Sequence, residues 1–319
     1  MYKGPRQLAR IALLVFILSI IVFEFPGARD LIQPPYSGTV TLNLLVQHVA
    51  SDGPNSGGVI RPDDEIVAVD GQRVRNRNHL RYLISLNTGF APQTYELRRG
   101  DEMLTATVNY AALPSSIIYR RFAFLLVGFT FIVMALLVLA RRRDQIGTLF
   151  ALNCAILAFL LTDRPIFHTA WLQLAGEFLA DALILMFPAV FLHFFLVFHD
   201  RPHRLSQRQQ TRRAAFVYAV PTLLYILSCF FAIRQFLGTA ASPAVTRLVM
   251  IVAAAYMTVF LAGSLFIFIR NYRASSVALK QKLRVAILGT TVGIVPFLIM
   301  VFWRQISAGP HALWDSLSV

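Results

Sequence analysis

Charged residues and cysteines are scarce in this chain of 319 residues. Asp, Glu, Lys and Arg together make up 14% of it, whereas hydrophobic residues make up 56% and Phe alone occurs 26 times. A chain this apolar cannot hide its hydrophobic side chains in a single water-soluble core. We therefore predict a polytopic α-helical membrane protein.

Acidic residues are the scarcer charge, with 16 Asp and Glu against 30 Lys and Arg, a formal net charge of +14. Such an excess can indicate nucleic-acid binding. Here, however, the basic residues fall mostly in short segments beside apolar runs, which is the distribution that membrane topology produces. We expect no nucleic-acid partner.

Patterns typical of metal and nucleophile chemistry are absent from the sequence. It contains no HExxH, and His193 and His199 are six positions apart, which does not stack them on one helical face. The two cysteines, Cys154 and Cys229, both lie in apolar runs and are expected to pack as small side chains. We expect no metal, no cofactor, no catalytic residue and no turnover by this chain alone.

Seven apolar runs have about the 20 residues that a helix needs to cross the hydrocarbon layer. We predict seven transmembrane helices at residues 8–25, 117–140, 146–161, 171–198, 214–236, 245–269 and 285–303. The first follows a basic start and lacks a clear cleavage site, so we expect an uncleaved anchor.

The basic residues of the connections predict the orientation. With the N-terminus inside, the inner segments contain sixteen Lys and Arg, and the short outer loops contain four. This asymmetry follows the positive-inside rule. It predicts a cytoplasmic N-terminus and an extracytoplasmic segment at about 26–116.

The segment after the first apolar run has the pattern of a small soluble domain. Residues 57–74 read GGVIRPDDEIVAVDGQRV, an extended approach, an alternating strand and an Asp-Gly turn. An amphipathic helix (76–86) and two strands around a Gly-Asp turn (95–108) follow. This order resembles a PDZ domain, and its core is expected to contain Val46, Val59, Ile66, Val69, Leu80, Ile84, Leu97 and Val108.

Two phrases in the membrane half carry a second resemblance. FLHFFLVF at 191–198, followed by Pro and basic residues, and KQKLRV at 280–285, leading into GTTVGIVPF, are similar to the N-terminal membrane sensory region of bacterial sensor histidine kinases and serine phosphatases. The resemblance implies location in the bacterial inner (cytoplasmic) membrane and an extracytoplasmic PDZ-like domain inserted after the first helix. It also implies a cytoplasmic effector, in cis or in trans, although no kinase or phosphatase motif occurs in this chain.

These observations divide the chain into four parts. We predict a first transmembrane helix at 1–25, a linker at 26–35, a small α+β PDZ-like domain at 36–112 and a six-helix sensor region at 113–319.

The PDZ resemblance implies that a peptide or protein C-terminus binds as an added strand. The matching loop and strand provide Gly38, Thr39, Val40, Leu42 and Leu44, with residues 42–47 expected to form one strand; an ordinary strand entry is the alternative. If Asn76 or Asn78 caps the following helix, His79 and Leu83 lie near the groove.

Polar residues inside apolar runs are the other candidates, because charge in lipid is costly and tends to mark function. Glu177 and Asp181 are four positions apart and share one helical face, and His193 lies further along the same run. The two acids could bind a cation or proton or line a pocket between helices, and His193 could at most join a proton- or metal-responsive patch. The alternative for the two acids is a wet helix start that favours negative charge.

We expect a signal receptor that senses a peptide, protein or lipid cue and passes it to a cytoplasmic effector. The alternative is a PDZ-tethered membrane hydrolase or transport component. Membrane lipids are expected partners, and a homodimer is left open.

Overall fold

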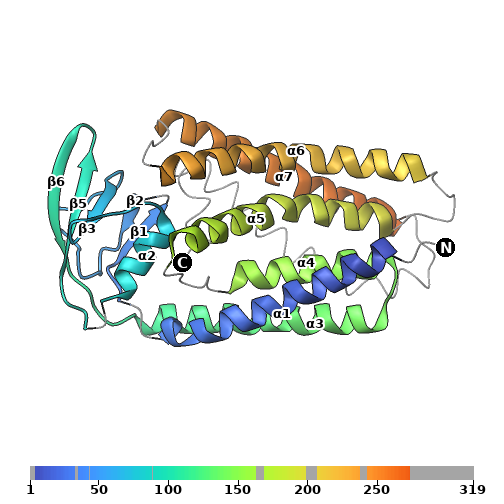
Figure 1. Ribbon diagram of the computed structural model, residues 1–319, viewed down its shortest axis with the longest axis horizontal. Helices are drawn as coiled ribbons and strands as arrows, with labels where there is room; N and C mark the ends of the chain where they lie inside the picture. The colour runs from blue at the N-terminus through green and yellow to red at the C-terminus, as the bar shows by residue number, and fades with distance from the viewer. Residues whose placement is uncertain are drawn as a thin grey trace.

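The computed structural model describes residues 4–32, 35–42, 44–87, 89–162, 169–198, 207–237 and 243–273. The structure has a helical part and a part that contains a β-sheet (Figure 1). Six long or apolar helices lie along the long axis of the molecule, and a small sheet with one short helix covers one end of them.

The six helices alternate in direction along the chain (Figure 1). Their bounds are α1 (Gly4–Ile32), α3 (Ser115–Arg141), α4 (Gln145–Leu161), α5 (Ala170–Phe198), α6 (Gln207–Phe236) and α7 (Pro243–Arg273). Four of these helices, α3, α5, α6 and α7, contain a stretch that is long and apolar enough to cross a membrane. The apolar stretches of α1 and α4 are shorter. The expected segment at 285–303 lies outside the described residues.

α1 continues to Ile32, through most of the expected linker. Pro26 and Gly27 lie inside the helix, although both residues usually interrupt one. Helix propensity is a weak local preference, and here the helix continues past both residues to Ile32. The first helix is therefore longer than the sequence predicted.

The small unit is an antiparallel sheet with one helix against it. Its strands are β1 (Thr39–Leu42), β2 (Leu45–Val49), β3 (Glu65–Val69), β4 (Gln72–Arg73), β5 (Gln93–Arg99) and β6 (Glu102–Val108), and its helix is α2 (Arg77–Ser85). The strand order is β1-β2-β3-β5-β6, with β4 paired to β3. Tyr36 and Ala111 exchange two backbone hydrogen bonds of 3.0 Å, so the chain enters and leaves the unit at one place.

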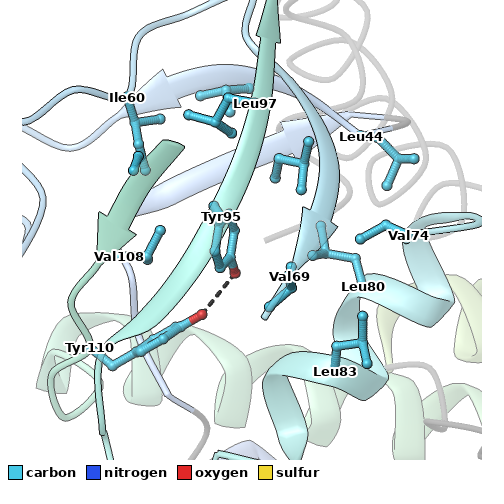
Figure 2. Packing of buried hydrophobic residues seen from close by; sticks show 13 residues of the cluster. Leu44, Ile60, Val69, Val74, Leu80, Leu83, Tyr95, Leu97, Val108 and Tyr110 are labelled. Carbon is cyan, nitrogen blue, oxygen red and sulfur yellow. Dashed lines mark hydrogen bonds between the residues drawn. The ribbon is translucent and has the colours of Figure 1, made fainter. Parts of the chain in front are cut away.

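The core of this unit lies between α2 and the sheet (Figure 2). Six of the eight predicted core residues are fully buried, and Ile84 packs partly buried against them. Val59 was wrongly predicted, because it is 53% exposed while Ile60 is 6% exposed. Residues 51–59 are turns rather than a strand, so strand alternation does not decide which side chain faces inward.

The expected strand at 42–47 is in fact divided. β1 ends at Leu42 and β2 begins at Leu45, with Leu44 between them at a φ of +71°. A left-handed residue reverses the chain there, so β1 and β2 form an antiparallel hairpin. Leu44 is consequently a core residue, 4% exposed.

Candidate functional site

The loop before β1 is held by its neighbours. Gly38 has a φ of +73°, and a Cβ there would lie 3.0 Å from the Cα of Gly53. The amide of Asn55 donates to the carbonyl of Ser37 (2.7 Å) and to that of Asn109 (2.9 Å). Asn55 thus ties this loop to the chain leaving β6.

β1 lies at the edge of the sheet. Within the described residues it pairs only with β2, with a register shift between Val40 and Thr41. Leu44, just beyond β1, packs in the same cluster as Leu80 and Leu83 of α2. The turn after β1 and one face of α2 therefore contribute to the same core.

α2 begins as expected, with Asn76 as its N-cap. The Asn76 side chain accepts a hydrogen bond of 2.8 Å from the backbone N–H of His79. The His79 ring nitrogen Nδ1 accepts one from the N–H of Arg75 (3.2 Å), and the ring stacks on Tyr82. Burial, and then the positive charge of Arg75, lower the pKa of His79, so the ring is neutral at pH 7.

A pocket of about 280 Å³ opens at the other end of α2. Its lining includes Leu83 of α2 and the C-cap residue Leu86, Asp70 after β3 and Gln72 of β4, and Pro92 and Gln93 at the start of β5. Its walls combine apolar side chains with one carboxylate and three side-chain amides, those of Gln72, Asn87 and Gln93. Such a mixture suits an apolar peptide side chain followed by a polar group.

A chain of hydrogen bonds that runs from the exposed Asp70 to buried tyrosines supports the polar wall of this pocket. Asp70 accepts from the Gln93 amide (2.8 Å), Gln93 accepts from the Tyr110 hydroxyl (2.8 Å), and the hydroxyls of Tyr110 and Tyr95 are 2.7 Å apart (Figure 2). Burial raises the pKa of Tyr110 to about 12 and holds the pKa of Tyr95 well above its usual range, so both remain hydroxyl donors. Sequence reasoning missed this network, because its members lie on three separate segments.

The start of α2 rests on the long helices. The buried Asn78 side chain donates to the backbone carbonyl of Gln173 in α5 (3.1 Å). The Arg75 guanidinium lies over the Phe236 ring at the end of α6, 5.8 Å from its centroid. Nothing in the sequence pattern pairs these positions.

The polar candidates of α5 contact neighbouring helices. The Asp181 carboxylate accepts from the Ser228 hydroxyl of α6, and Glu177, one turn earlier, is half-buried. His193 Nδ1 lies 3.1 Å from the Tyr218 hydroxyl of α6. Each contact joins α5 to α6, so these residues hold helices together.

Two backbone carbonyls of α5 accept hydrogen bonds from side chains of α7. The Tyr256 hydroxyl donates to the carbonyl of Leu185 (2.8 Å), and the Asn271 amide donates to that of Phe195 (3.1 Å). Pro188 is buried within α5. α5 is therefore the helix that links the small unit with α6 and α7.

Across the described parts of the chain, no group of three or more His, Cys, Asp or Glu side chains is arranged to hold a metal ion. Cys154 is buried among α1, α3 and α4, and Cys229 is half-buried in α6. His199 and His203 lie outside the described residues.

Comparison of the sequence with protein-family models and with curated protein sequences found no significant match.

Proposed function

We propose that this chain is a bacterial inner-membrane signal receptor. In this proposal, residues 36–112 are an extracytoplasmic PDZ-like domain that binds the C-terminus of a peptide or protein. The helices pass the signal to a cytoplasmic histidine kinase or phosphatase, in cis or in trans. The observation that carries the proposal is that α2 borders the candidate groove and also contacts α5 and α6.

The edge position of β1 supports peptide binding. A PDZ domain takes its ligand as a strand added to an exposed sheet edge, and the ligand's side chains enter a neighbouring pocket. β1 is such an edge, and Leu44, just beyond its end, shares a core with Leu80 and Leu83 of α2. His79 and Leu83 are four positions apart on α2, and Leu83 lines the pocket described above.

The contacts at the start of α2 support transmission. A ligand between β1 and α2 would shift α2 relative to the sheet, and Asn78 and Arg75 connect that end of α2 to α5 and α6. Because α5 also bonds to α6 and α7, a movement of its first turn would alter several interhelical contacts.

The distribution of charge supports the orientation. The small unit lies at the end of the molecule where α1 ends and α3 begins, and the N-terminus lies at the opposite end (Figure 1). The sixteen-to-four excess of inner Lys and Arg favours a cytoplasmic location for that opposite end.

The test uses the full chain in lipid nanodiscs and a display library of random C-terminal peptides. We expect selected peptides to bind, and His79→Ala to weaken their binding about tenfold or more. Asn78→Ala should leave affinity within about twofold of the parent but abolish the peptide-induced change in hydrogen exchange of α5.

Asn109→Ala is the matched control, because Asn109 is an exposed asparagine of the same unit; it should change neither measurement. Failure to select any peptide would contradict peptide reception. An unchanged response of α5 in Asn78→Ala would contradict transmission through this contact.

A further inference from the structure

The end of α3, the start of α6 and the end of α7 lie together at the end of the molecule opposite the small unit (Figure 1). Seven exposed arginines belong to these helix ends. We call this set the arginine collar; it consists of residues 141–143 at the end of α3, Arg212 and Arg213 in α6, and Arg270 and Arg273 at the end of α7. Two contacts at this end hold the helices in place. Arg10 of α1 donates to the Leu139 carbonyl of α3, and Asn271 of α7 donates to the Phe195 carbonyl of α5.

The collar has almost no negative charge to balance it. In the described parts of the helix ends there, the only acidic residue is Asp144. Its carboxylate accepts from the N–H of Gly147 (3.0 Å) as the N-cap of α4. Among the described residues, no carboxylate forms an ion pair with any collar arginine. The collar therefore presents a strong, exposed positive field.

Exposed apolar side chains adjoin the arginines on the same helices. Leu137 is 48% exposed, Phe216 82% and Phe266 65%. A surface that passes from apolar to cationic within about one helical turn matches the boundary between acyl chains and headgroups. An acidic protein surface would match the arginines but would leave these side chains in water.

The other end of the apolar zone is marked by aromatic residues. Tyr119 at the start of α3 and Trp171 at the start of α5 are 74% and 66% exposed, as is typical of an aromatic belt. Arg141 follows Tyr119 by 22 positions, which is about 33 Å of α-helix. This length matches a hydrocarbon thickness of about 30 Å.

We propose that the arginine collar binds the phosphate groups of anionic phospholipids and selects them over zwitterionic lipids. Guanidinium groups pair with phosphate through two parallel hydrogen bonds. In a phosphatidylcholine headgroup, the positive charge of choline screens the negative charge of the phosphate and weakens this pairing. The inference does not depend on peptide binding at β1 and α2.

The experiment measures binding of fluorescent short-chain phosphatidylglycerol and phosphatidylcholine to the full chain in neutral detergent. We expect phosphatidylglycerol to bind at least tenfold more tightly, with the preference reduced at 0.5 M salt. Arg141→Gln/Arg143→Gln and, separately, Arg270→Gln/Arg273→Gln should each weaken phosphatidylglycerol binding roughly 10- to 30-fold.

Arg61→Gln/Arg73→Gln removes the same charge from exposed positions of the small unit and should leave lipid binding within about twofold. Circular dichroism checks that each variant keeps its helix content. Equal binding of the two lipids, or unchanged binding by both collar variants, would overturn the proposal. Tighter binding of polyglutamate than of phosphatidylglycerol would overturn the choice of lipid over an acidic protein.

Discussion

At the scale of single residues, the most informative ion pair joins Asp64 and Arg99. The Asp64 side chain is fully buried and accepts from Arg99 Nε (2.7 Å), Arg99 Nη2 (2.9 Å) and the backbone N–H of Arg61 (2.7 Å). Burial opposes ionisation of this carboxyl, but the hydrogen bonds from Arg99 and Arg61 outweigh it and lower its pKa.

Arg99→Gln should therefore lower the free energy of unfolding of the small unit by about 3 kcal/mol at pH 7, because it leaves a buried carboxylate poorly paired. A depressed pKa stabilises the fold above the unfolded value, about 3.9, and this contribution is lost as pH falls below it. The difference between parent and variant should thus shrink from pH 5 toward pH 3. Hydrogen exchange of β5 and β6 in the full chain measures this difference in unfolding free energy.

The neighbouring Arg98 provides the control for that measurement. Its guanidinium pairs with Glu65 on the surface, where 46% of the Arg98 side chain is exposed. Arg98→Gln should cost under about 1 kcal/mol. Equal losses in the two variants would contradict the distinction between a buried and a surface pair.

Gly38 is a second residue-scale case, because it combines a positive φ with a close backbone contact. Gly38→Ala should destabilise the small unit by more than Gly100→Ala, which is the matched substitution. Gly100 has a φ of +62° and nothing within 4 Å of an added Cβ, so its variant reports only the conformational cost of about 1–2 kcal/mol. Hydrogen exchange of β1 and β2 gives both values, and a smaller loss for Gly38→Ala would contradict the close contact.

At the scale of elements, the small unit has its own core, and its first and last residues are paired through Tyr36 and Ala111. Residues 36–112 alone should unfold in urea in one cooperative transition. Ile66→Ala should lower its stability by about 2–5 kcal/mol, because Ile66 is 2% exposed in the core. Val59→Ala, at an exposed position, should change it by less than about 0.5 kcal/mol. A gradual, non-cooperative transition of the parent segment would contradict independent folding.

Sequence reasoning located several parts of the candidate site and missed others. The N-cap at Asn76 was foreseeable, because an asparagine side chain bonds to a backbone N–H only three residues away. The hairpin break at Leu44 was not, because a leucine with positive φ has no sequence signal. The pocket wall and the Asn78–Gln173 contact join segments far apart in the chain.

At the scale of the whole molecule, the alternation of helices makes a topology prediction. α3 runs from the small unit to the collar, α5 repeats that direction, and α6 returns (Figure 1). Reporter fusions after Gly100 should report outside, and fusions after Arg142 and Gln207 inside, because the collar arginines resist translocation. An outside signal at Gln207 would overturn the assignment, and a fusion after Arg10 serves as the inside reference.

The sequence by itself determined what depends on neighbours along the chain: the apolar helices, the alternating strands β3 and β5, and the cap of α2. These follow from the length, periodicity and hydrogen bonding of short segments. Only the tertiary structure decided which distant groups meet. Asn55 joins Ser37 to Asn109, Tyr110 joins Gln93 to Tyr95, and Asn78 joins the sheet unit to α5. Such contacts arise because buried polar groups must find partners wherever packing brings them, and sequence spacing does not record that packing.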